Sequence, residues 1–180
     1  MKNSKAATLT RIAAMTAITC IMGPLSIPLP FSPVPISLTV LAVYLSAYVL
    51  GMKYGTISYI TYLLIGFVGA PVFSGFTGGA GKLAGPTGGY LIGFIFMALI
   101  VGFFIDHFNA NTLKTVIGMI LGTIVCYIFG TLWLAHSSGT SFVASLQFGV
   151  LPYIPADIIK MIIAIIIGKP LRKAMHSIKS

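Results

Sequence analysis

Only two of the 180 residues are acidic, Asp106 and Asp157, and this scarcity of charge is the strongest constraint on the fold. Charged side chains make up 7% of the chain, whereas a soluble domain carries about 25%. Such a chain cannot cover a water-exposed surface, and its 57% hydrophobic content also excludes disorder. We therefore expect residues 1–180 to form a single membrane-embedded domain.

The apolar runs predict an all-α integral membrane protein with six transmembrane helices. A spanning helix needs about 20 mostly apolar residues. The first run follows Lys2 and Lys5 as in a signal peptide, but it lacks a small-x-small cleavage site, so we expect it to remain as a span. The six runs, several of them short, lie at about Thr8–Gly23, Ile36–Leu50, Thr56–Ala70, Gly89–Ile105, Val116–Ala135 and Tyr153–Gly168.

The distribution of cations predicts that both termini are cytoplasmic, because Lys and Arg beside spans collect on the cytoplasmic side. Only Lys82 then lies outside, and Lys160 falls within the sixth span. Cations spread so thinly form no basic patch, so we expect a multi-pass protein of the cell membrane and no nucleic-acid partner. The cytoplasmic set is Lys2, Lys5, Arg11, Lys53, Lys114, Lys169, Arg172, Lys173 and Lys179.

Asp157 and Lys160 are the most informative pair, because they share one face of the sixth helix. Each charge at the centre of a span costs about 2.5 to 3.5 kcal/mol on insertion scales. Such residues face the protein interior or a wet cavity and mark functional sites. The alternative is an ion pair that only locks the helix in place, since apolar packing can often replace a buried pair.

Two outer loops are candidates for the rest of a site. The loop Pro71–Gly88 is rich in glycine, which allows close backbone approach to a ligand, and Thr87 and Tyr90 add polar groups. The alternative is a flexible turn. The loop Pro24–Pro35 is stiff and apolar and contains Phe31, so it either covers the site or is a plain connector.

Cysteine and histidine give no sign of a metal site or cofactor. Cys20 and Cys126 each lie inside an apolar run, and the histidines are isolated. Small residues recur at helix-packing spacing. Most of these pairs should be internal, but one could dock a partner helix: Ala13 and Ala17, Gly89 and Gly93, Gly118 and Gly122.

The combination of three motifs with six predicted spans resembles the BioY family, the biotin-specific S-components of energy-coupling-factor transporters. The motifs are Pro33-Val34-Pro35, the run Gly85–Leu91 and the run Pro155–Lys160. The resemblance covers essentially the whole chain. It implies a six-helix subunit that binds biotin near the outer face and associates with a transmembrane coupling subunit and two cytoplasmic ATPases.

The resemblance also assigns residues. It carries the family's ligand-binding Asp and Lys to Asp157 and Lys160, and its Gly-Pro-Thr-Gly-Gly-Tyr run to Gly85–Tyr90. Ala13 and Ala17 resemble the Ala-x-x-x-Ala pattern that docks the coupling subunit. Two positions depart from the family: Ala156 stands where Gly is frequent, and Thr39 stands where Gln is common.

Biotin has an apolar bicyclic ring, a ureido group and a carboxylate, and a dry pocket with few polar groups suits it. We expect Asp157 to accept ureido N–H bonds, and Lys160 either to donate to the ureido oxygen or to pair with the carboxylate. The other predicted contacts are hydrogen bonds from Thr87 and Tyr90, and ring contacts from Phe31 and Phe73.

The sequence is also compatible with two other functions. One is an integral-membrane enzyme acting on a lipid-linked substrate, although two acids far apart supply no catalytic pair. The other is a proton-coupled carrier that works alone through Asp157 and Lys160. We expect a transport subunit and no enzyme.

Overall fold

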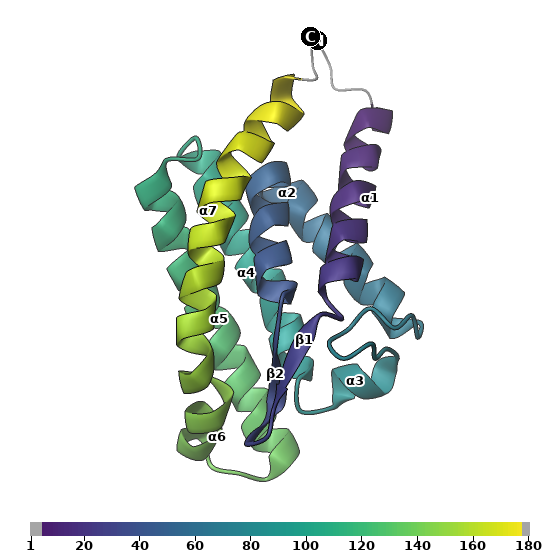
Figure 1. The fold of residues 1–180 in the computed structure, drawn as a ribbon, viewed down its shortest axis with the longest axis vertical. Coiled ribbons are helices and arrows are strands. Elements are labelled where there is room, and N and C mark those ends of the chain that lie inside the picture. The colour runs from purple at the N-terminus through teal and green to yellow at the C-terminus, as the bar shows by residue number, and fades with distance from the viewer. Residues whose placement is uncertain (1–4, 178–180) are drawn as a thin grey trace.

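The computed structural model describes residues 5–177, which fold mainly into helices (Figure 1). The elements in chain order are α1 (Lys5–Met22), β1 (Ser26–Leu29), β2 (Ser32–Ser37), α2 (Thr39–Phe67), α3 (Ala80–Ala84), α4 (Gly88–His107), α5 (Thr112–Ser138), α6 (Phe142–Gly149), the 3₁₀ helix η1 (Leu151–Tyr153) and α7 (Ile154–Ser177).

Four helical segments within the described residues are long and apolar enough to cross a membrane: Thr39–Phe67, Gly88–His107, Thr112–Ser138 and Phe142–Met175. The expectation of a mainly helical, multi-pass membrane protein is confirmed. The predicted first span coincides with α1, which is not among these four; it is short and carries Lys5 and Arg11.

Helix α2 covers both the predicted second and third spans. Gly51 divides it into two halves, because its backbone is non-helical (φ 76°, ψ −171°). Glycine tolerates this positive φ, which a side chain would strain. In Figure 1 the chain rises through the first half of α2 and descends through the second. The two halves touch near the break, since a Cβ on Gly55 would lie 3.0 Å from the Cα of Ala47.

The segment Pro24–Pro35, which we expected to be a stiff loop, contains two strands, and the fold is therefore not strictly all-α. Strands β1 and β2 form an antiparallel hairpin in which Ser26 pairs with Ser37 and Leu29 with Ser32. Both strands of a two-stranded hairpin are edge strands, so their prolines need not donate to a neighbour. The second span accordingly begins at Thr39, not at Ile36.

The small-residue pairs of α4 and α5 are internal packing positions, as predicted for most such pairs. A Cβ on Gly93 would lie 3.0 Å from the Cα of Cys126, and one on Gly122 would lie 3.3 Å from the Cα of Met97. Such close approach brings α4 and α5 together along the core. Ala13 and Ala17 are different, because both are exposed on α1.

Candidate functional site

A cavity lies between the hairpin and helices α2, α4, α5 and α7, and four of the predicted site residues line it: Asp157, Lys160, Thr87 and Tyr90. The remaining wall is mostly apolar, which is typical of small-molecule sites. It consists of Val34, Pro35, Ser37, Thr39, Val40, Ser74, Leu91, Phe94, Met97, Cys126, Tyr127, Gly149 and Tyr153.

Asp157 and Lys160 form a buried ion pair on this wall. The Lys160 Nζ lies 2.9 Å from the Asp157 Oδ1, and the two residues are only 6% and 4% exposed respectively. Asp157 lies in the first turn of α7. Backbone N–H groups without helical partners and the positive end of the helix dipole favour a carboxylate there. The local fold thus keeps a charged carboxylate inside an apolar wall.

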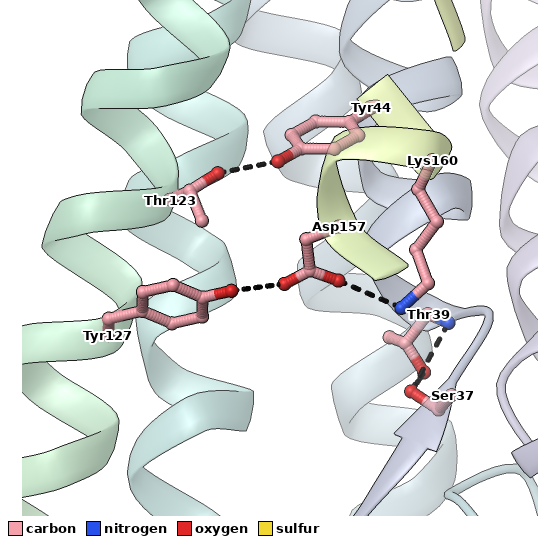
Figure 2. A network of polar contacts seen from close by, with 7 residues as sticks. All are labelled: Ser37, Thr39, Tyr44, Thr123, Tyr127, Asp157 and Lys160. Carbon is pink, nitrogen blue, oxygen red and sulfur yellow. Dashed lines mark hydrogen bonds and ion pairs between the residues drawn. The ribbon is translucent and has the colours of Figure 1, made fainter. Parts of the chain in front are cut away.

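Tyr127 fixes the other oxygen of this carboxylate. Its hydroxyl donates to the Asp157 Oδ2 at 2.6 Å, so Asp157 lies between Tyr127 of α5 and Lys160 of α7 (Figure 2). With both oxygens engaged, the carboxylate has one defined orientation, and each oxygen still has lone-pair capacity for a ligand donor. Tyr127 was not among the predicted site residues, because in the sequence it is distinguished only by a hydroxyl in the middle of an apolar run.

Further hydroxyl pairs surround the ion pair. Tyr44 and Thr123 are hydrogen-bonded at 2.5 Å, and Ser37 donates to the Thr39 Oγ1 at 3.1 Å (Figure 2). Thr39, at the position where the family commonly has Gln, therefore presents its side chain to the cavity wall and not to the membrane. The structure thus adds Thr39 and Ser37 to the candidate ligand contacts.

The hairpin is tied over the cavity through Tyr153. The Tyr153 hydroxyl is hydrogen-bonded to the Val34 carbonyl and to the Ser32 hydroxyl, the latter at 2.8 Å. These bonds join β2 to η1, directly before the helix that carries Asp157. Of the two alternatives for the proline-rich loop, a cover for the site is the one that the structure favours.

Tyr90 and Thr87 occupy the start of α4. The Tyr90 hydroxyl donates to the Gly149 carbonyl at 2.9 Å, so it fastens α4 to α6, and Tyr90 also lines the cavity. Thr87 is the N-cap residue of α4 and is 7% exposed. Thr87, at the end of the glycine-rich loop, is therefore a buried part of the cavity wall.

Three other predicted residues do not line the cavity. Phe73 is fully buried, and its ring packs edge-on against that of Tyr62, with centroids 5.5 Å apart. The Gly85 carbonyl accepts a hydrogen bond from the Trp133 Nε1 at 2.9 Å. Phe31 is 60% exposed at the turn of the hairpin. Contact between these residues and a ligand stays a prediction.

The site's chemistry is that of recognition. One carboxylate and one ammonium lie side by side in an apolar cavity, so they fit a neutral ligand group that presents N–H donors next to an oxygen acceptor. Among residues 5–177, no group of three or more His, Cys, Asp or Glu side chains could hold a metal ion.

Comparison with known proteins gives consistent matches. Residues 1–177 match the model of the BioY family. The chain is 37% identical over 175 residues to "Biotin transporter BioY2" of Lactococcus lactis subsp. cremoris, covering 97% of this chain and 95% of that protein. It is 39% identical over 147 residues to "Biotin transporter BioY" of Thermotoga maritima, covering 82% of this chain and 86% of that protein.

The fold also matches a solved structure. That structure is described as the S-component for biotin from an ECF-type ABC transporter, and its TM-score against this chain is 0.89. The two sequences are 38% identical, and the match covers 96% of this chain and 95% of the other. At this level the likeness extends beyond a shared arrangement of helices to the sequence itself.

Proposed function

The chain belongs to the BioY family, and on that premise we propose that it captures biotin as the substrate-binding subunit of an energy-coupling-factor transporter. The observation that carries the proposal is the buried pair of Asp157 and Lys160 on the wall of an apolar cavity. The relatives are transporters, which supports a transport role and no enzymatic one.

The ureido group of biotin fits the charged pair. Asp157 accepts a hydrogen bond from one ureido N–H, and the Lys160 ammonium, with three donors, binds the adjacent ureido oxygen while it keeps its bond to Asp157. The pair is already neutral. The carboxylate of biotin would bring an uncompensated charge into the cavity at high cost, so it lies nearer the opening.

The apolar part of biotin has matching walls. Leu91, Phe94 and Met97 line the cavity from α4, and Val34 and Pro35 line it from the hairpin. These side chains contact the bicyclic ring and the alkyl chain. Removal of this apolar surface from water supplies the non-directional part of the affinity, and the charged pair supplies the orientation.

We propose six spans with both termini cytoplasmic and the cavity near the outer face, all within one substrate-binding domain over residues 1–180. The start of α1 and the end of α7 lie at the same end of the molecule in Figure 1, which supports an even number of spans. Lys82 belongs to α3, at the opposite end. Lys2 and Lys179 lie outside the described residues. The cations assigned to the cytoplasmic side within them are Lys5, Arg11, Lys53, Lys114, Lys169, Arg172 and Lys173.

The partners are a transmembrane coupling subunit and two cytoplasmic ATPases. Ala13 and Ala17 support this, because they leave a strip of α1 exposed where a second helix can approach closely. No tightly packed neighbour within the described part of the chain covers this strip. We assign it to the coupling subunit.

Replacing Ala13 by Trp should abolish biotin uptake while biotin binding by the isolated subunit stays unchanged. The indole would occupy the space that a docked helix needs, on a helix that does not line the cavity. Leu121→Trp is the matched control, since Leu121 is an exposed apolar residue of α5. The measurement is uptake of labelled biotin by cells that express this chain together with the coupling subunit and ATPases, with binding titrated separately.

A module with inactive ATPases should give the same loss of uptake. Uptake that persists without ATPase activity and collapses with an uncoupler would instead support a proton-coupled carrier that works alone. Equal uptake by Ala13→Trp and Leu121→Trp would contradict the docking assignment. Chemical conversion of a lipid-linked substrate by the purified chain would support an enzyme.

A further inference from the structure

A second cavity lies at the end of the molecule that we assign to the cytoplasmic side, and two cations line it, Arg11 and Arg172. It has a volume of about 150 Å³ and is lined by residues of α1, α2, α4 and α7. Since a water needs roughly 10 to 15 Å³ on this scale, the cavity has room for a group the size of phosphate. The lining residues are Thr8, Arg11, Val49, Leu50, Tyr54, Asp106, Arg172 and Met175.

The only acid in this cavity is already engaged on both oxygens. The Asp106 Oδ2 accepts the Met52 N–H at 2.8 Å, which caps the second half of α2, and its Oδ1 pairs with the Arg172 Nη2 at 3.1 Å. The Arg172 Nη1 donates to the Tyr48 carbonyl at 2.9 Å, at the end of the first half. Arg172 uses two of its five N–H donors in this way.

Arg11 is left as the uncompensated charge. The chain has two acidic side chains, and the structure pairs Asp157 with Lys160 and Asp106 with Arg172. No acidic side chain remains for Arg11 within the described part of the chain. The cavity therefore carries one net positive charge, a free guanidinium and the remaining donors of a second one, which together suit an anion with several oxygens.

We propose that this cavity binds the phosphate group of an anionic phospholipid from the cytoplasmic leaflet, with Arg11 as its principal donor. Basic pockets between transmembrane helices on the cytoplasmic side bind such headgroups. Arg172 contributes its remaining N–H donors, and Tyr54 borders the site. The inference rests on the proposed orientation, since the anionic lipids lie on that side, but not on the identity of the vitamin.

The test is native mass spectrometry of the purified chain in detergent, titrated with short-chain phosphatidylglycerol. Arg11→Gln should weaken lipid binding about tenfold, because a charge-assisted hydrogen bond and a net charge are lost. Arg11→Lys keeps the charge and should retain part of the affinity. Lys114→Gln is the matched control: Lys114 is another assigned cytoplasmic cation that does not line the cavity, and it should change the affinity by less than about threefold.

Equal lipid affinity in Arg11→Gln and Lys114→Gln would overturn the proposal. A second arm adds inorganic phosphate, which we expect not to displace the lipid at millimolar concentration; full displacement would mean a site for free anions and would overturn the lipid assignment. Biotin binding by Arg11→Gln should equal that of the wild type, which shows that the variant is folded. Failure of the wild type to bind biotin would refute the proposed function and leave the lipid result to be judged separately.

Discussion

Asp157→Asn should lower the affinity of the purified protein for biotin by about a hundredfold. The carboxylate accepts from Lys160 and Tyr127 and, as proposed above, from one ureido N–H group. Each hydrogen bond to a charged group contributes roughly 1.5 to 3 kcal/mol. The Asn amide has the same shape but carries one oxygen in place of two and adds donors that oppose the ligand's own donors. Isothermal titration with biotin measures the change.

Asp106→Asn is the matched control for this experiment, because it makes the same chemical change in the other acid of the chain. Asp106 does not line the cavity proposed for biotin, and it pairs with Arg172 at the opposite end of the molecule. We expect unchanged biotin affinity, even where loss of the ion pair with Arg172 lowers the thermal stability. Equal loss of biotin affinity in the two variants, or no loss in Asp157→Asn, would contradict the assignment of Asp157 to the biotin site.

The double variant Asp157→Asn with Lys160→Met should fold but should gain no thermal stability from biotin. Replacing a buried ion pair by neutral side chains of similar volume is often neutral for stability, and the Asn oxygen can still accept from Tyr127. At biotin a hundred times its dissociation constant, the wild type gains about 2.7 kcal/mol. The measurement is thermal unfolding in detergent with and without biotin.

This double variant separates the two interpretations of the charged pair. If Asp157 and Lys160 only hold α7 against its neighbours, the neutral side chains hold it equally well, and biotin stabilises the double variant as much as it does the wild type. If the two residues bind the ligand, the biotin-dependent shift is lost although the variant is folded. A full shift in the double variant would therefore refute our assignment of the site.

The central pair was predictable from the sequence because a charge inside a membrane span is costly. With two acids in the chain and Asp106 near the end of its span, Asp157 was the one acid well within a predicted span. Its spacing from Lys160 gives the shared face, and the structure shows the ion pair. The break at Gly51 agrees with the apolar runs, because the predicted second span ends at Leu50 and the third begins at Thr56.

Other parts were not predictable because their signals are ambiguous. Tyr127 carries no charge, so a tyrosine in an apolar span is as compatible with core packing as with the carboxylate contact that it makes. Phe73 was predicted to contact the ligand, and the structure buries its ring against that of Tyr62. An aromatic residue in a loop suits core packing or ligand contact, so the sequence does not distinguish the two. The hairpin was read as a loop because its prolines suppress a strand prediction, although edge strands tolerate them.

The most direct test of the central claim is calorimetric titration of the purified wild-type chain with biotin, alongside riboflavin and thiamine. We expect saturable one-to-one binding of biotin by the isolated subunit, without coupling subunit or ATPases, and no measurable heat of binding for the other two vitamins. Absence of biotin binding by folded protein, or equal binding of all three vitamins, would contradict the proposed function.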